Sequence, residues 1–371
     1  PEATPSTVPM SRLIDDGPLR AEISAERPLF LHNVFPGAEV APADQVDGLL
    51  RIWPDDLEPY VGVQFVLPAQ PPAAAAETER WIDAALDATD AAELPALVQV
   101  AALGLRTGPD DAVLGQLFDR PRSFVGVGGA EFSAPFAAAT QGLAQSDVDL
   151  LVDLVGLAAG HRAHFLWQDM GYFGPQVFVD AGSNPTLAAT LRDHGEHVIL
   201  QAKRNGTAKR FVTDAAVFGW WVSGQVGNWG VNSEDWLWWE AGYEQRFAPQ
   251  ITGDLGVAGF PRRASPDKSR LSYPEALFGT EALMAAAAGA TVFSIESPTR
   301  GYGDVATGDP SAAGSEVVFP TLRSILAHGL IASREDRADA VRGALVIDGR
   351  NAPELDFDAV FRPLYGPAQC G

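Results

Sequence analysis

The stretch FVGVGGAEF occupies residues 124–132 and is a short apolar run with one acid, Glu131, near its carboxyl end. Its large residues are β-branched or aromatic and leave no polar face, which is typical of a strand buried on both sides. Gly128 and Gly129 lie just before Glu131, and glycines at such a point allow another backbone or a ligand to approach closely. The run therefore predicts a buried parallel strand that carries a carboxylate at its carboxyl end.

Seven further runs of this kind are spaced along the chain, at residues 28–34, 61–66, 97–101, 164–169, 197–203, 216–222 and 290–296. Segments whose apolar residues have helical spacing lie between them, at residues 78–87, 147–159, 185–193, 274–288 and 317–331. A strand and a helix that alternate eight times, at intervals of about thirty residues, are typical of a (β/α)8 TIM barrel. We therefore expect an α/β protein of this class.

The pattern also suggests where the barrel begins and ends. The Ala-, Pro- and Thr-rich start, PEATPSTVP, indicates an N-terminal tail or linker over residues 1–27, and the catalytic barrel is expected to occupy residues 28–335. The alternation then stops, and the run ALVID at residues 344–348 indicates a new strand. Residues 336–371 are therefore expected to form the start of a β-rich C-terminal appendage.

Charge excludes several classes of partner. Acidic residues outnumber basic ones by 48 to 26, which gives a formal net charge of -22. A nucleic-acid-binding surface requires clustered positive charge, and this chain has no basic cluster, so we expect no nucleic-acid partner. The sequence also has no apolar run long enough to span a bilayer, and we expect no membrane partner. A neutral small molecule or polymer suits this charge better.

Neither a metal nor an organic cofactor is expected. Cys370 is the single cysteine, so an intrachain disulfide and a cysteine zinc site are both excluded. The six histidines have no metal-ligand spacing, and the glycines match neither a phosphate loop nor a dinucleotide fingerprint. The tail-like start is compatible with a mature exported protein, and we expect a secreted or cell-surface monomer.

Most of the tryptophans lie in one segment, AVFGWWVSGQVGNWGVNSEDWLWWE, at residues 216–240. It contains six of the nine: Trp220, Trp221, Trp229, Trp236, Trp238 and Trp239. One interpretation is that these rings are core, because each buries a large apolar area. The amides and acids between them favour a carbohydrate site, since a sugar offers an apolar face for stacking and hydroxyls for polar groups. The segment also lies in the longest interval between predicted strands, and long loops that follow barrel strands form the functional face.

Three predicted strands end in an acid: Glu131, Asp169 and Glu296. The carboxyl ends of barrel strands meet at one mouth, where barrel enzymes carry out their chemistry. Glycoside hydrolysis requires two carboxyl groups, one that protonates the leaving oxygen and one that activates water or attacks carbon. Glu131 and Glu296, on the fourth and eighth strands, would face each other across the mouth. The alternative is that these acids cap helices or pair with Lys203 or Arg263.

Other residues near the predicted mouth are candidates for substrate binding. Lys203, at the end of the sixth strand, could hold a sugar hydroxyl or neutralise a neighbouring acid. Further candidates are stacking rings and polar side chains: Trp229, Trp236, Trp167, Asn228, Asp169 and His32. For His32 the alternative is a buried structural histidine, and for Asp235, a candidate catalytic group, the alternative is a helix cap.

The segment GWWVSGQVGNWGVNSEDWLWWEAGY, at residues 219–243, resembles the catalytic domain of glycoside hydrolase family 98. Supporting stretches are WQDMGYF at 167–173, the strand with Glu131, GATVFSIESP at 289–298 and GLIASREDRADAVRGALV at 329–346. The resemblance covers most of the chain between about residues 28 and 346.

This resemblance implies an endo-acting enzyme with a (β/α)8 barrel and an associated β-sandwich domain. Activities in the family include endo-β-1,4-galactosidase on blood-group glycans and endo-xylanase, so the partner would be an oligosaccharide or polysaccharide. The family mechanism is inverting. By position, Glu131 corresponds to the acid and Glu296 to the base, and Asp235 is the available aspartate that assists the base.

Two alternatives remain open. In a retaining glycosidase the second carboxylate is a nucleophile, and its carboxyl group lies about 5 Å from the first, whereas about 6.5–9.5 Å leaves room for a water. In a non-catalytic carbohydrate-binding barrel, the tryptophans alone would hold the glycan, and no sugar would be released.

Overall fold

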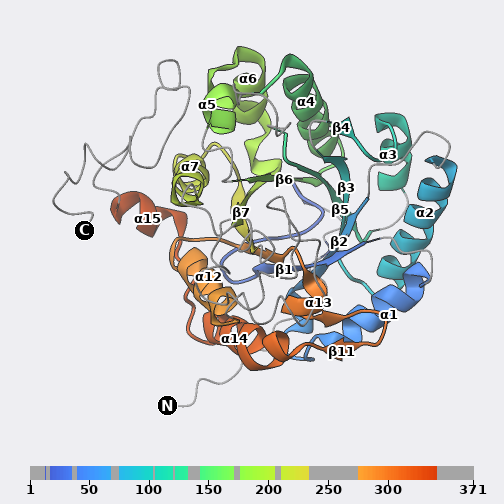
Figure 1. The fold of residues 1–371 in the computed structure, drawn as a ribbon. Coiled ribbons are helices and arrows are strands. Elements are labelled where there is room, and N and C mark those ends of the chain that lie inside the picture. The colour runs from blue at the N-terminus through green and yellow to red at the C-terminus, as the bar shows by residue number, and fades with distance from the viewer. Residues whose placement is uncertain are drawn as a thin grey trace, which may run out of the picture.

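The computed structural model describes residue 13 and residues 17–35, 40–67, 75–102, 105–119, 122–132, 143–170, 176–204, 210–233 and 275–340. Within these ranges a closed barrel of parallel strands is surrounded by helices (Figure 1). The barrel strands are β1 (Leu29–Val34), β2 (Val61–Val66), β3 (Ala96–Ala102), β5 (Phe124–Ala130), β6 (His164–Met170), β7 (Val198–Arg204), β8 (Asn228–Ser233) and β9 (Val292–Ile295). Because β9 pairs with β1 as well as with β8, the sheet has no open edge, and the (β/α)8 barrel is confirmed.

The helical layer follows the strands in order around the barrel (Figure 1). Its longer members are α1 (Pro42–Ile52), α2 (Ala75–Ala91), α3 (Asp111–Phe118), α4 (Gln145–Gly160), α5 (Gln176–Ser183), α6 (Pro185–His194), α7 (Arg210–Val222), α12 (Ala276–Ala287), α14 (Phe319–Ala327) and α15 (Arg334–Ala340). Local sequence explains where several begin. The Asn184 side chain accepts hydrogen bonds from the amides of Thr186 and Leu187, and Pro185 occupies the first turn of α6.

Short elements complete the fold. They are β4 (Leu105–Arg106), which pairs antiparallel with the end of β3, the hairpin of β10 (Gly303–Asp304) and β11 (Asp309–Pro310), the single turn α13 (Pro298–Gly301), the 3-10 turns Glu58–Tyr60 and Gly195–His197, and a π-helical turn, Gly314–Val318, that leads into α14. No helix in the described part of the chain is both long and apolar enough to cross a membrane.

The seventh strand is not where the sequence pattern placed it. Residues 216–222 were expected to form this strand, but they are the carboxyl-terminal half of α7. Val217 and Trp221, four residues apart, are the buried pair, which is helical spacing. The true strand is β8, NWGVNS, in which Trp229 and Val231 alternate with residues that face the barrel interior. Its polar interior face left no continuous apolar run for the sequence pattern to detect.

Two cores lie on the two faces of the barrel wall. Inside the barrel, an aliphatic layer is formed by Leu29, Leu31, Leu97, Val125, Leu166, Ile199 and Val292. Outside it, a larger core fills the space between strands and helices. Side chains alternate between these two cores along each strand. Both faces of every barrel strand are therefore buried, which decides where each candidate site residue can point.

Part of the expected N-terminal tail belongs to the barrel. Ala21 and Ile23, together with Leu13, join the aliphatic layer and cover its amino-terminal end. Arg20 donates hydrogen bonds to the carbonyl oxygens of His161 and Phe124, at 3.1 and 2.9 Å. The prediction that residues 1–27 form a tail is therefore wrong for residues 17–27, because the open end of a barrel exposes apolar side chains that these residues cover.

The carboxyl-terminal boundary also differs from the expectation. Helix α15 continues to Ala340, so residues 336–340 are helical and do not begin a β-rich region. The strand expected at residues 344–348 lies outside the described residues.

Candidate active site

A layer of four buried glutamines crosses the barrel above the aliphatic layer. We call Gln64, Gln99, Gln168 and Gln201 the glutamine layer; all are at most 6% exposed. Gln64 donates to Gln99 at 3.1 Å, Gln168 donates to Gln64 at 3.2 Å, and Gln201 donates to the Ser294 hydroxyl at 3.0 Å. Barrel interiors are ordinarily filled by branched apolar side chains, so this layer is a departure from the common pattern. Because its amides hydrogen-bond to one another, the glutamine layer forms a polar floor on the side of the barrel that faces the carboxyl ends of the strands.

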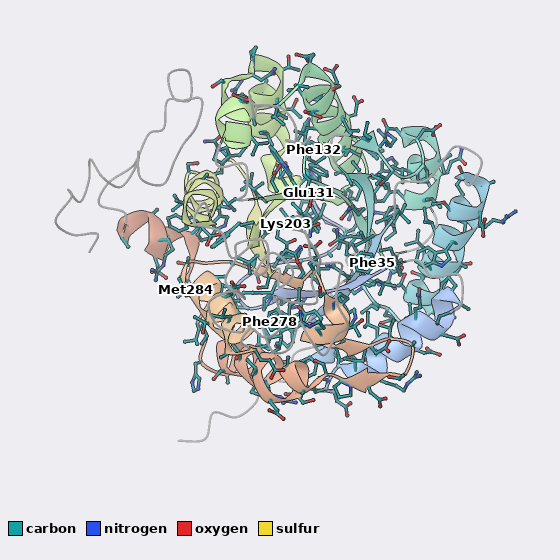
Figure 2. The ribbon with its side chains drawn as sticks, viewed as in Figure 1. Phe35, Glu131, Phe132, Lys203, Phe278 and Met284 are labelled. Carbon is teal, nitrogen blue, oxygen red and sulfur yellow. The ribbon has the colours of Figure 1, made fainter. Side chains whose placement is uncertain are left out.

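Above the glutamine layer, a pocket of about 100 Å³ opens at the carboxyl ends of the strands. Every barrel strand contributes a residue at or next to its end. The lining residues are Asn33, Phe35, Val66, Gln99, Ala102, Ala130, Glu131, Gln168, Lys203, Asn232 and Glu296. Figure 2 shows Glu131, Lys203 and Phe35 lying toward the middle of the barrel.

Lys203 joins the two candidate catalytic glutamates in this pocket. Its Nζ atom lies 2.5 Å from Glu131 Oε1 and 3.4 Å from Glu296 Oε2, so these two oxygens are no more than about 5.9 Å apart. The Lys203 side chain is 5% exposed, against 18% for Glu131 and 20% for Glu296. A cation placed between two carboxylates lowers their mutual repulsion, and partial burial strengthens that effect. The structure therefore brings together three residues that the sequence placed at the ends of three separate strands.

Glu131 has an unusual backbone. Its φ of 59° lies in the left-handed region, which non-glycine residues rarely adopt. Its amide donates to the Gln168 carbonyl at 2.9 Å, so pairing with β6 continues one residue beyond β5. Left-handed backbone at a non-glycine residue costs on the order of 1–3 kcal/mol and is concentrated at functional sites. This conformation directs the carboxylate away from the strand path and toward Lys203.

The two glycines before Glu131 serve the packing around it. A Cβ atom on Gly129 would lie 2.4 Å from the Phe132 ring, and one on Gly128 would lie 3.3 Å from the Gln64 amide. The close approach expected from the sequence is therefore made by side chains of the protein itself.

The backbone of Glu296 is held by the neighbouring strand, because its amide donates to the Ser233 carbonyl at the end of β8 at 3.0 Å.

Three of the predicted substrate-binding residues face the helices instead of the pocket. On β6, Gln168 points inward, so its neighbours Trp167 and Asp169 point outward, and Trp167 Nε1 donates to Asp169 Oδ2 at 3.1 Å. His32 on β1 also points outward and accepts a hydrogen bond from Trp53 Nε1 at 3.2 Å. Its burial lowers its pKa to about 3. The substrate-binding roles predicted for Trp167, Asp169 and His32 are wrong, because strand alternation directs them into the outer core.

The expectations for Trp229 and Asn228 also fail, for two different reasons. Trp229 is 1% exposed and packs against Phe218 and Trp221 of α7, so it is a core ring with no face open to a sugar. Asn228 points into the barrel but stands at the beginning of β8, the end opposite the pocket, where Thr291 donates to its Oδ1 at 2.8 Å. For Trp229, the core interpretation of the tryptophan-rich segment is therefore the correct one.

Asp235 and Trp236 lie outside the described residues. The neighbouring described residue, Ser233, ends β8 at the pocket side of the barrel. Within the described ranges, no group of three or more His, Cys, Asp or Glu side chains is arranged to hold a metal ion.

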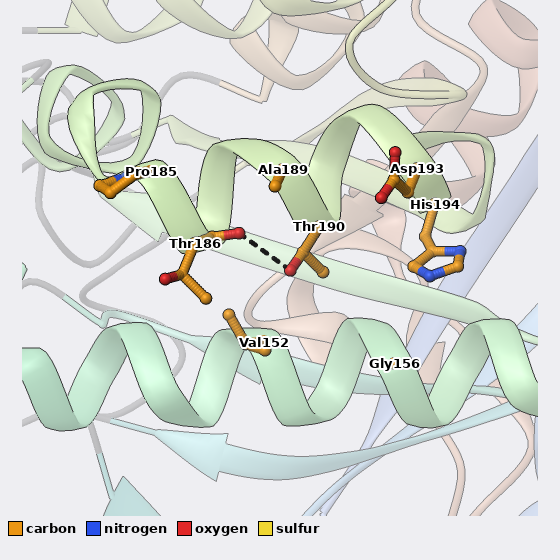
Figure 3. A pocket seen from close by; sticks show the side chains of 8 residues that line it. All are labelled: Val152, Gly156, Pro185, Thr186, Ala189, Thr190, Asp193 and His194. Carbon is orange, nitrogen blue, oxygen red and sulfur yellow. Dashed lines mark hydrogen bonds between the residues drawn. The ribbon is translucent and has the colours of Figure 1, made fainter.

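A larger hollow lies elsewhere and does not carry comparable chemistry. It has about 570 Å³ and lies on the outside of the barrel between α4 and α6 (Figure 3). Its lining includes small and uncharged side chains such as Gly156, Ala189 and Thr190, with Asp193 and His194 at one end. No paired carboxylates converge there, whereas the smaller pocket in the barrel mouth holds two glutamates and a lysine.

Sequence reasoning missed several residues that line the pocket. Asn33 is on β1 and Phe35 is the first residue after this strand. The two residues are two positions apart, so both face the inward side and line the pocket. The glutamine layer had a visible signal, because four of the eight predicted strand runs each contain one glutamine. Burying one glutamine without a hydrogen-bond partner costs free energy. Four glutamines in otherwise apolar strands can be partners for one another, so their recurrence indicated that they would lie together.

Comparisons with known proteins agree with this geometry. The family model for glycosyl hydrolase family 98 matches residues 17–330. A blood-group-substance endo-1,4-beta-galactosidase of Clostridium perfringens is 24% identical over 307 residues, which are 76% of this chain and 37% of that protein. This chain therefore spans little more than a third of that relative's length.

Solved structures show the same fold. The catalytic module of a family 98 glycoside hydrolase from Streptococcus pneumoniae TIGR4, in complex with the H-disaccharide blood group antigen, matches with a TM-score of 0.68 and 19% identity, over 87% of this chain and 55% of that one. The same module in complex with the LewisY pentasaccharide matches with a TM-score of 0.68 and 20% identity over the same shares. With a family model that covers residues 17–330 and a barrel that carries paired glutamates at its mouth, the chain belongs to glycosyl hydrolase family 98.

Proposed function

We propose that this chain is the catalytic domain of an inverting, endo-acting glycoside hydrolase that cleaves internal β-1,4-galactoside or β-1,4-xyloside bonds. The observation that carries the glycoside hydrolase part of the proposal is the placement of Glu131 and Glu296 around Lys203 at the barrel mouth. The inverting course of the reaction rests on the resemblance to the family. Two carboxyl groups in one pocket are the chemical requirement for glycoside hydrolysis. Membership of the family supports the same reaction class.

In this mechanism Glu131 is the general acid. It transfers its proton to the glycosidic oxygen as the bond from that oxygen to the anomeric carbon breaks. Glu296 is the general base: it removes a proton from a water that attacks the anomeric carbon from the opposite face. The products are a shortened glycan and a reducing sugar with inverted configuration. Lys203, which contacts both glutamates, balances the charge that moves between them.

Asp235 is proposed to assist Glu296 in orienting the water. Support comes from its position in the chain, two residues after Ser233, which ends β8 beside Glu296. Trp236, the next residue, is proposed as a stacking ring for the glycan. Both residues lie outside the described ranges, so these roles rest on chain position and on the family resemblance.

The substrate is proposed to be a neutral oligosaccharide or polysaccharide outside the cell. The Clostridium relative is named for action on blood-group substance, and the Streptococcus structures contain blood-group oligosaccharides. We favour a galactoside for this reason and keep the xyloside as the second candidate. We propose further that the domain acts as a monomer, because the two glutamates and Lys203 all come from one chain.

A product screen tests the proposal. The native protein is incubated with a LewisY glycan, a β-1,4-galactan and xylan, beside Glu131→Gln, Glu296→Gln and the control Asp193→Asn. Asp193 is on α6 and lines the hollow between α4 and α6 on the outside of the barrel, so the Asp193→Asn variant should cleave normally. Release of oligosaccharides by the native protein and the control, and by neither glutamate variant, is the expected result. Binding without release would instead support the non-catalytic carbohydrate-binding barrel.

Retention is the competing mechanism, and one distance favours it. Glu131 Oε1 and Glu296 Oε2 lie no more than about 5.9 Å apart, close to the separation of about 5–5.5 Å found in retaining enzymes. Proton NMR of the first product decides between the two. We expect an α-anomer from a β-linkage, and a β-anomer would make Glu296 the nucleophile.

A further inference from the structure

We infer that the end of β1 forms a sugar-binding pair, in which Asn33 accepts a hydrogen bond from a ring hydroxyl and Phe35 stacks on the apolar face of the same sugar. This inference rests on the proposed function, because it takes the ligand of the pocket to be a glycan. It assigns the two side chains that would fix the sugar beside the catalytic glutamates.

Asn33 is almost fully buried and only half satisfied. It is 4% exposed, and its Nδ2 donates to the Ile295 carbonyl at 3.2 Å, which ties the amide to β9. In the described part of the chain, no donor is within hydrogen-bond distance of its Oδ1. A buried amide oxygen without a donor costs about 1–3 kcal/mol, so a ligand hydroxyl that donates to it would recover this cost.

The position of Asn33 makes such a ligand a sugar in the active site. The same pocket is lined by Glu131, Glu296 and Lys203, so a ring whose anomeric carbon lies between the glutamates has its hydroxyls within the space that Asn33 borders. The Asn33 Nδ2 bond to Ile295 matters here, because Glu296 is the next residue. The Asn33 side chain is therefore held against the strand that precedes the proposed base, Glu296, and its Oδ1 is the proposed acceptor for the sugar hydroxyl.

Phe35 supplies the apolar half of the pair. It is 47% exposed, which is unusual for so large an apolar side chain, and it lines the same pocket. Its carbonyl accepts a hydrogen bond from the Gln45 side chain at 3.4 Å, which holds this end of β1 against α1. An exposed ring beside a polar acceptor is the arrangement that a sugar ring requires.

Binding measurements in a Glu131→Gln background test the pair, because no turnover complicates them. Affinity for the LewisY pentasaccharide and for xylotetraose is measured by calorimetry. We expect Asn33→Ala and Phe35→Ala each to weaken binding of the accepted oligosaccharide about three- to tenfold, the loss of one hydrogen bond or one ring contact.

Two matched controls separate binding from stability. Asn228→Ala removes another inward asparagine, at the opposite end of the barrel, and Met284→Ala removes another exposed apolar side chain, on α12. Both should leave affinity unchanged, even if Asn228→Ala melts earlier. Equal affinity in the Glu131→Gln protein with and without Asn33→Ala, or no binding of either oligosaccharide, would overturn the inference.

Deoxy analogues of the accepted oligosaccharide identify the hydroxyl. One ring position should matter for binding to Glu131→Gln and not to the Glu131→Gln/Asn33→Ala double variant, and an analogue series with no such position contradicts the hydrogen bond. These results are independent of catalysis. Failure of the proposed function would appear as binding without cleavage, whereas failure of this inference would appear as cleavage with unchanged affinity in the Asn33 and Phe35 variants.

Discussion

Replacing Lys203 with methionine should destabilise the protein through repulsion between Glu131 and Glu296. The substitution keeps an unbranched apolar stem and removes the ammonium that lies 2.5 and 3.4 Å from the two carboxylates. At a separation of about 6 Å and an effective dielectric constant of about 20, two negative charges repel by about 3 kcal/mol. Solvent screening at these partly exposed side chains lowers the expected loss to about 1–3 kcal/mol.

The loss should depend on salt with a definite sign. Added salt screens partly exposed charges, so the deficit of the variant relative to the native protein should be largest at low salt and should shrink as salt is added. Urea unfolding at several salt concentrations, followed by tryptophan fluorescence, measures this difference.

A double-mutant cycle provides the control. In the Lys203→Met background, Glu131→Gln removes one of the two charges and should recover about 1–3 kcal/mol of unfolding free energy. In the native background the same change removes a partner of Lys203 and should not stabilise. An identical effect of Glu131→Gln in both backgrounds, or a Lys203→Met deficit that is the same at every salt concentration, would refute the electrostatic reasoning and leave only a packing effect.

Three further predictions follow from individual environments. Trp229→Ala should lower the unfolding free energy by about 3–5 kcal/mol and leave glycan affinity unchanged, because the ring is 1% exposed in the outer core; weaker binding in the folded variant would restore Trp229 to the site. Glu131→Gly should be about 1 kcal/mol more stable than Glu131→Ala by urea unfolding, because φ is 59° there, and equal stability would argue against backbone strain. Burial lowers the His32 pKa from its ordinary value of 6.5 to about 3. Between these two pH values the unfolded chain is protonated at His32 and the folded protein is not, so the free energy of unfolding decreases as the pH falls from about 6.5 to about 3. His32→Asn, which keeps an acceptor for Trp53, should therefore reduce the slope of stability against pH below 6 by about 1.4 kcal/mol per unit, and an unchanged slope would contradict this account.

The candidate site was only partly predictable because barrel strands are buried on both faces. In a half-exposed sheet, polar residues mark the solvent side, but in β6 the polar pair Gln168 and Asp169 are neighbours that point to opposite cores. Sequence order alone could not decide which of them belonged to the pocket. The same ambiguity misplaced Trp167 and His32.

Composition misled the prediction where local propensity and tertiary context disagreed. The run at residues 216–222 is aromatic and β-branched, which favours a strand, yet it packs as the end of α7 with Val217 and Trp221 inward. The true strand, β8, contains only two large apolar side chains. Asn228, Gly230 and Asn232 alternate with these two side chains and face the hydrogen-bonded interior, where Asn232 accepts from Ser294 at 2.9 Å.

By itself, the sequence determined the barrel and the placement of its strand-end acids. Seven of the eight spaced apolar runs are barrel strands, and a closed parallel sheet buries both of their faces. Parallel strands bring their carboxyl ends to one rim, so Glu131 and Glu296 share a mouth. Only the tertiary structure decided what surrounds them. Lys203 between the glutamates, the glutamine layer beneath them and the unpaired Asn33 Oδ1 depend on where each strand stands around the barrel. That angular position is set by strand register and by packing against the helices, which act between residues far apart in the chain and leave no local pattern.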